Sequence, residues 1–172
     1  MSQTSKRMFG CIKYSRRQIQ PIRVTRKEKS RMIRVILSLP RLYIVNARWL
    51  TFDDLLNMEC EVAVFRHHSF AAEDVKQFIN HWMAGSNPKL MHLRLHGFEL
   101  EPNWERILEG IEYGVWDKKT NKRPRNFQNR YIYSIEEIDC KNGLDFERKS
   151  DGMIGTVMHQ SDWIDFFVWH DI

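Results

Sequence analysis

An alternation of short strand-type runs with helix-type stripes constrains the fold of this chain most strongly. The runs occupy residues 39–45, 60–65 and 90–95, and each precedes a segment whose apolar residues have helical spacing. The first and third runs fit L-x-x-L-x-L, and the middle run keeps the alternation as Val62 and Val64. Parallel strands need a long crossover connection, which is usually a helix. The sequence therefore predicts an α/β fold with parallel strands.

The helical segments show the 3.6-residue period of helices that bury one side. The clearest stripe has apolar residues at i, i+3, i+4 and i+7: Val75, Phe78, Ile79 and Trp82. Residues 104–111 repeat this spacing after Asn103, and a shorter stripe begins at Phe52 after Thr51. Asn and Thr are favoured N-cap residues, and glycine commonly follows a helix C-terminus. We therefore expect helices that start after Thr51 and Asn103, and one that ends near Gly85.

The distance between the strand-type runs resembles that of a repeat protein. Equivalent positions at Leu42, Val62 and Leu93 are 20 and 31 residues apart, which straddles the length of a leucine-rich repeat. We expect residues 32–112 to form a small, irregular, leucine-rich-repeat-like stack of strands and helices. The polar, basic stretch that follows, residues 113–131, is expected to be a loop.

Residues 132–172 have the pattern of an antiparallel meander. Two strand-type runs, 144–149 and 153–160, flank the Ser-Asp-Gly sequence at 150–152, and Asp-Gly is a strong hairpin signal. An aromatic run at 163–170 supplies a third strand. We expect this C-terminal β meander to close the end of the stack and cover its exposed sheet edge or core.

Positive charge is concentrated at the N-terminus. Residues 1–34 hold 11 of the 27 lysines and arginines but one of the 22 acidic residues, which gives a net charge of +10 there and −5 in the rest of the chain. Residues 1–31 are expected to be a poorly ordered basic leader. Clustered Lys and Arg also attract polyanions, so residues 6–34 could contact nucleic acid weakly. A nuclear or nucleic-acid-associated protein that acts through this leader is therefore an alternative function.

The strand pattern also identifies a candidate protein-binding face. Side chains alternate across a strand, so the residues between the leucines lie on the face opposite the core. That open face is expected to carry a polar and aromatic set: Arg41, Tyr43, Glu61, His92 and Arg94. Such a mixture suits the binding of another protein.

Several stretches of the chain resemble one known family. They are WLTFDDLLNMECEVAVF, FAAEDVKQFINHWMAGSNPKLMHLRLHGF, NWERILEGIEYGVWD, LDFERKSDGMIGTV and FFVWH. Together they resemble the nematode F-box-associated domain, type 2, over residues 41–169. The match rests on the Trp-x-x-Gly-Ser-Asn-Pro-x-Leu junction, the Leu-Glu-Gly-Ile helix end and the Arg-x-x-Asp-Gly hairpin, in that order. The resemblance makes residues 32–172 an F-box-associated domain.

The resemblance implies a role in ubiquitin transfer. In that family an N-terminal F-box docks on the Skp adaptor of a cullin ubiquitin ligase, and the associated domain selects the target protein. The first 34 residues, which are basic and contain few leucines, do not resemble an F-box. We therefore expect a substrate-recognition module for an unknown target protein, with Skp and cullin as partners only if an F-box contact is retained.

No motif indicates catalysis, a cofactor or a metal. His92 and His96 have the i, i+4 spacing of helical zinc ligands, but they lie in a strand-type run with no third ligand nearby. The acidic pairs at 53–54 and 73–74 lie in first helical turns, where the helix dipole favours negative charge. We therefore expect a binding protein rather than an enzyme.

The cysteines and the hydropathy pattern bear on location. Cys11, Cys60 and Cys140 lack C-x-x-C spacing, so free thiols in a reducing compartment are expected. The chain has neither a signal-peptide core nor a run of about 18 apolar residues. A cytoplasmic or nuclear location without membrane contact is expected.

Overall fold

The computed structural model describes residues 13–14, 17–18, 26–119, 122–130 and 135–170. Its helices are α1 (Arg26–Leu37), α2 (Phe52–Leu56), α3 (Ala72–Met83) and α4 (Trp104–Ile107). Its strands are β1 (Lys13–Tyr14), β2 (Arg17–Gln18), β3 (Arg41–Ile44), β4 (Val62–Phe65), β5 (His92–His96), β6 (Tyr113–Val115), β7 (Asn126–Arg130), β8 (Ile135–Asp139), β9 (Leu144–Glu147), β10 (Ile154–Gln160) and β11 (Trp163–Trp169). No helix in these described ranges is long and apolar enough to cross a bilayer.

The predicted basic leader, residues 1–31, lies mostly outside the described residues. Its last part belongs to α1, which begins at Arg26 and runs across the predicted boundary between leader and domain. That boundary therefore stays a prediction.

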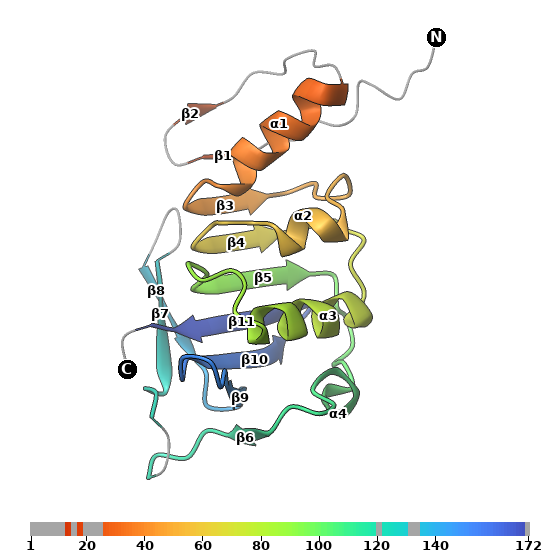
Figure 1. Ribbon diagram of the computed structural model, residues 1–172. Coiled ribbons are helices and arrows are strands. Elements are labelled where there is room, and N and C mark those ends of the chain that lie inside the picture. The colour runs from red at the N-terminus through yellow and green to blue at the C-terminus, as the bar shows by residue number, and fades with distance from the viewer. Residues whose placement is uncertain (1–12, 15–16, 19–25, 120–121, 131–134, 171–172) are drawn as a thin grey trace.

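A seven-stranded mixed sheet organises the chain (Figure 1). Its strand order is β3-β4-β5-β11-β10-β9-β6. β3, β4 and β5 are parallel, as the helical connections predict, and the four pairings beyond β5 are antiparallel. The predicted α/β class is confirmed. A leucine-rich-repeat-like stack is not confirmed, because the parallel strands and the meander of β9, β10 and β11 form one sheet.

The starts of α2 and α4 and the end of α3 lie where the sequence predicts special residues. The α3 stripe is buried, with each member at most 4% exposed: Val75, Phe78, Ile79 and Trp82. α2 follows a capping box in which Thr51 Oγ1 accepts from the Asp54 backbone N–H at 3.2 Å and the Asp54 carboxylate accepts from the Thr51 N–H at 2.9 Å. Asn103 caps α4 by accepting from the backbone N–H of Arg106 at 2.9 Å. Gly85 follows α3 with φ of 98°, the left-handed conformation that glycine adopts readily.

The sheet buries side chains on both faces. Neighbouring strand residues point to opposite faces, and Phe166 and Phe167 accordingly belong to two separate apolar clusters. α3 covers the first face, where the rings of Trp82 and Phe166 pack edge to face with centroids 5.3 Å apart. On the second face the β7–β8 ribbon contributes Phe127, whose ring centroid lies 4.7 Å from that of Phe167. The sheet therefore lies between helices and a two-stranded ribbon.

The stretch 113–131, expected to be a loop, contains β6 and β7 instead. β6 pairs with β9 at the edge of the sheet, and β7 pairs with β8. Arg123, between these strands, is only 3% exposed. Its guanidinium donates to the Asp145 carboxylate at 2.8 Å and to the Cys140 carbonyl at 2.8 Å. A buried ion pair thus fixes a segment that has no apolar periodicity to predict it.

Candidate protein-binding site

Four of the predicted binding residues share the sheet face opposite α3. The register pairs Arg41 with Val62 and Val62 with His92, which forms one row across β3, β4 and β5. Tyr43 and Arg94 lie two residues further along their strands, in the next row of the same face. The sequence alternation therefore placed these four residues together correctly, but it was wrong for Glu61. Glu61 precedes β4, and Val62 stands in the row with Arg41 and His92, because Leu42 is in register with Ala63 rather than with Val62.

Two of these residues are buried, which corrects the expectation of an open face. His92 is 0% exposed and Arg94 is 8% exposed. Asp165 in β11 lies in register with Arg94 and binds both side chains. Phe127 of the β7–β8 ribbon lies beside His92, with ring centroids 5.9 Å apart. A direct role for His92 and Arg94 in protein binding stays a prediction.

The Asp165 carboxylate is the centre of a buried polar network. It accepts hydrogen bonds from His92 Nε2 at 2.8 Å, from Arg94 Nε at 2.6 Å and from the Trp163 indole N–H at 2.9 Å. A second bond from Arg94 Nη2, at 3.0 Å, makes the ion pair bidentate. Burial raises the pKa of Asp165, but the bonds from His92 and Arg94 outweigh burial and hold the pKa below its ordinary value. The network therefore joins β5 to β11 through an ionised carboxylate.

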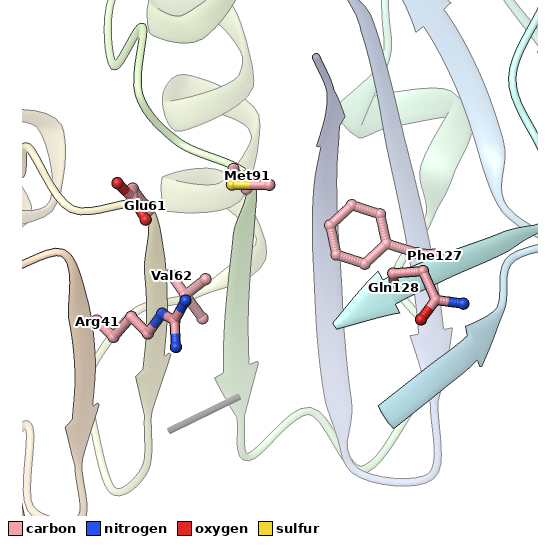
Figure 2. A pocket seen from close by; sticks show the side chains of 6 residues that line it. All are labelled: Arg41, Glu61, Val62, Met91, Phe127 and Gln128. Carbon is pink, nitrogen blue, oxygen red and sulfur yellow. The ribbon is translucent and has the colours of Figure 1, made fainter. Parts of the chain in front are cut away.

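A small pocket opens at the N-terminal ends of β3, β4 and β5 (Figure 2). Six residues line it: Arg41, Glu61, Val62, Met91, Phe127 and Gln128. Arg41 and Glu61 bring opposite charges, and Val62, Met91 and Phe127 bring apolar surface. Within the described part of the chain, the side chains of Arg41 and Glu61 form no hydrogen bond or ion pair. The pocket therefore combines an apolar wall with two charged side chains that form no hydrogen bond or ion pair with the described residues.

The sequence prediction included only part of this pocket. Arg41 and Glu61 were predicted, whereas Met91 precedes its strand and Phe127 lies in the stretch expected to be a loop. Asp165 was missed although its sequence context carried a signal. A single carboxylate within the apolar run 163–170 needs a buried partner, because an unpaired buried charge is costly.

The turn that carries the family resemblance after α3 connects two helix ends. Asn87 has φ of 50°, and its side-chain amide donates to the carbonyls of Leu56 at 3.2 Å and Met58 at 2.8 Å. These carbonyls lie at and just beyond the end of α2. Asn87 therefore fixes the end of α3 against the end of α2.

The hairpin that carries the resemblance is held to the same region. Arg148 is 2% exposed and donates to the two carboxylate oxygens of Asp151 at 2.9 and 2.7 Å. It also donates to the Trp82 carbonyl at 3.1 Å, and its guanidinium lies 4.4 Å from the Trp82 ring centroid. A cation is favoured at a helix C-terminus by the helix dipole. Both motifs therefore stabilise the fold and contribute no residue to the pocket.

The reactive residue types that the structure describes are buried or scattered. Burial raises the pKa of Cys60 and of Cys140 to about 12, and both thiols are free. Among the described residues, no three His, Cys, Asp or Glu side chains are grouped so that they could hold a metal ion. The two cysteines pack as small apolar side chains.

A family model described as F-box associated matches residues 33–95. Residues 33–95 are therefore similar to the F-box-associated family. This family region contains β3, β4 and β5, together with the α2 and α3 connections between them. The resemblance predicted from the sequence motifs is thus confirmed over residues 33–95, and its extension to residue 169 stays a prediction.

Two uncharacterized proteins of Caenorhabditis elegans are similar to most of the chain. One is 31% identical over 150 residues, which are 82% of this chain and 33% of that protein. The other is 29% identical over 142 residues, which are 77% of this chain and 31% of that protein. The chain therefore spans about a third of the length of these relatives.

A ubiquitin ligase is also among the similar proteins. The E3 ubiquitin-protein ligase hecw-1 of Caenorhabditis elegans is 26% identical over 83 residues, which are 48% of this chain and 7% of that protein. No solved structure matches the chain.

Proposed function

We propose that this chain is a protein-recognition module that selects a target for ubiquitin transfer, with the pocket at the ends of β3, β4 and β5 as its contact site. The observation that carries the proposal is the overlap of the family region with the pocket. Four of the six lining residues fall within residues 33–95: Arg41, Glu61, Val62 and Met91.

The chemistry of the pocket suits a protein segment. Protein interfaces combine an apolar centre with a polar rim, and arginine is enriched in them. Arg41 and Glu61 can bind charged groups of a target without breaking an existing bond in the described part of the chain. Met91, which is partly exposed, can contact an apolar side chain of the same target above the buried Phe127 ring. We expect a short segment with one apolar residue between charged neighbours to bind here.

The link to ubiquitin transfer rests on the comparisons. The F-box-associated family is a family of protein-interaction domains, and a similar protein carries the name of an E3 ubiquitin-protein ligase. Contacts with a Skp adaptor and a cullin belong to this proposal, for a chain that acts in the cytoplasm or nucleus. The alternative of nucleic-acid binding through residues 6–34 gains no support from the family match or the relatives.

Affinity capture from nematode extract at physiological salt tests the proposal. The tagged full chain is compared with Arg41→Glu, which reverses one charge of the pocket, and with Arg48→Glu as the control. Arg48 is exposed and lies outside the pocket. We expect Arg41→Glu to lose target proteins that Arg48→Glu retains, and we expect a Skp adaptor and a cullin to be recovered with the wild type.

Two outcomes would contradict separate parts of the proposal. The same set of proteins from both variants would exclude the pocket as the contact site. Targets recovered without Skp or cullin would exclude the ligase connection. Arg94→Glu is unsuitable for this experiment, because it would place a second carboxylate beside Asp165 in a buried network.

A further inference from the structure

Met91 supplies the accessible apolar surface of the pocket (Figure 2). Three apolar side chains line the pocket, and two of them are almost fully buried, with Val62 at 4% and Phe127 at 5% exposed. Met91 is partly exposed, so it is the one of the three that a target can contact over a substantial area. The apolar character of this pocket therefore depends mainly on a single side chain.

The backbone of Met91 is fixed, whereas its thioether reaches the pocket. The Met91 N–H donates to the Glu61 carbonyl at 2.8 Å, and the Met91 carbonyl accepts from the Val168 N–H at 2.9 Å. The side chain packs against the apolar cluster that contains Phe127 and lines the pocket together with Glu61. A chemical change at the sulfur would therefore act on the pocket without releasing the strand.

Methionine is the apolar residue type that a mild oxidant makes polar. The sulfur lone pair attacks hydrogen peroxide, the O–O bond breaks, and one oxygen stays on the sulfur while the other leaves with both protons as water. The resulting sulfoxide is polar, and methionine sulfoxide reductases return it to the thioether with electrons from thiols, releasing the oxygen as water. Oxidation therefore disrupts contacts that depend on a methionine side chain.

The other described methionines provide comparisons within the same chain. Met58 and Met158 are buried, at 2% and 5% exposed. Met32 and Met83 are partly exposed, like Met91, but they pack against the other apolar cluster and do not line the pocket. Among the described methionines, Met91 alone lines this pocket.

We propose that Met91 is a site of reversible oxidation and that its sulfoxide weakens target binding at the pocket. Peroxide changes the accessible wall of the pocket from apolar to polar, while Arg41 and Glu61 keep their charges. The effect on targets rests on the proposed function. The oxidation itself rests on the exposure of Met91 alone.

Mass spectrometry after treatment with hydrogen peroxide tests the modification site without any target. The full chain is treated for increasing times, and the oxygen added to each methionine is measured. We expect Met91 to be oxidised at least about tenfold faster than Met58 and Met158, because oxidation requires access to the sulfur. Methionine sulfoxide reductase with a thiol should reverse the change. Equal rates at the three methionines would overturn the proposal.

Target capture tests the consequence of the oxidation. The targets are the proteins that the untreated wild type captures and Arg41→Glu loses. Peroxide treatment of the wild type should reduce their recovery about tenfold, because burial of a methionine side chain contributes roughly that factor or more to affinity. Met91→Leu has a similar volume but no thioether and should retain the targets after the same treatment. Met83→Leu is the matched control and should lose them as the wild type does.

Met91→Gln reproduces the effect without an oxidant. It places a polar side chain of similar length in the pocket, and the untreated variant should lose the targets. Targets retained by the peroxide-treated wild type, or lost by treated Met91→Leu, would overturn the proposal. Proteins captured equally by the untreated wild type and Arg41→Glu would contradict the proposed function instead, and the oxidation rates would still decide whether Met91 is the modification site.

Discussion

Asp165 joins strands that come from distant parts of the sequence. Its partners His92 and Arg94 lie in β5, and its own strand β11 begins after the last hairpin turn. A buried carboxylate is costly unless it is paired and hydrogen-bonded, and here three donors satisfy it. Removing its charge would turn the bidentate ion pair with the buried Arg94 guanidinium into bonds to a neutral amide.

Asp165→Asn should therefore reduce the free energy of unfolding at pH 7 by about 3–5 kcal/mol, the usual effect of removing one partner of a buried ion pair. Urea denaturation measures this change. Asp139→Asn is the control, because Asp139 and its partner Arg125 are about half exposed and exposed pairs contribute little. Equal unfolding free energies for the wild type and Asp165→Asn would contradict this role of Asp165.

Urea denaturation of the same two proteins at acid pH tests whether the negative charge of Asp165 stabilises the folded protein. The pKa of folded Asp165 lies below its ordinary value of 3.8. The stabilisation from its charge is therefore fully present when the pH is above the ordinary pKa. It is lost as the pH falls through the lowered pKa of the folded protein. The difference in the free energy of unfolding between the wild type and Asp165→Asn should shrink as the pH falls from the ordinary pKa through the lowered pKa of Asp165.

For single residues, the sequence predicted the sheet face on which a side chain lies better than it predicted whether that side chain is buried. Alternation placed Arg41, Tyr43, His92 and Arg94 on one face correctly. It was wrong for Glu61, which precedes β4 while Val62 takes the place in that row. It could not show that Asp165 and Phe127 would cover part of that face, because both come from segments that are distant in sequence. A polar residue type alone does not distinguish an exposed position from a buried, paired one.

Among the elements, β10 depends on a glycine where it passes beneath α3. A Cβ on Gly155 would lie 2.8 Å from Phe146 Cε2 and 3.1 Å from Trp82 Cζ3. Gly155→Ala should therefore overpack this contact and destabilise the protein by about 1–3 kcal/mol. The control is Gly114→Ala, where nothing lies within 4 Å of the added carbon. The two midpoints of guanidinium unfolding, each measured on dilute protein, should differ clearly, and coinciding midpoints would show that the contact can relax.

The elements with strong periodicity were predictable, and the short ones were not. α3 follows its apolar stripe, whereas α4 ends at Ile107 although the stripe of 104–111 continues. Gly110, with φ of 79°, lies where a longer helix would continue. β6 and β7 have no clear alternation, and the buried Arg123 that lies between them looks like one more basic loop residue in the sequence.

On the scale of the whole molecule, one sheet should unfold as one unit. In a repeat array each unit contacts only its neighbours, and parts can unfold separately. Here the pairing of β5 with β11 and the Asp165 network join the parallel and antiparallel parts. Urea transitions followed by tryptophan fluorescence and by far-UV circular dichroism should therefore coincide. Separated transitions would indicate two independent units instead.

The pairing of β5 with β11 is also the feature that could not be predicted from the sequence. The chain order suggested that the meander would close the stack, but nothing in residues 163–170 specifies β5 as their neighbour. The pairing depends on a buried ion pair between residues 71 positions apart. Long-range pairings of this kind come from the complementarity of two surfaces, which single-sequence patterns do not contain.

The separation between the residues that hold the fold and those that line the pocket has a consequence for diversification. The side chains of Asn87 and Arg148 each form several hydrogen bonds that hold the fold, whereas those of Arg41 and Glu61 form no hydrogen bond or ion pair with the described residues. Exchanging the two pocket charges would therefore leave the scaffold intact while changing what it can hold. Under the proposed function, a lineage that carries this scaffold would acquire new targets through a few substitutions at strand ends, without passing through unfolded intermediates.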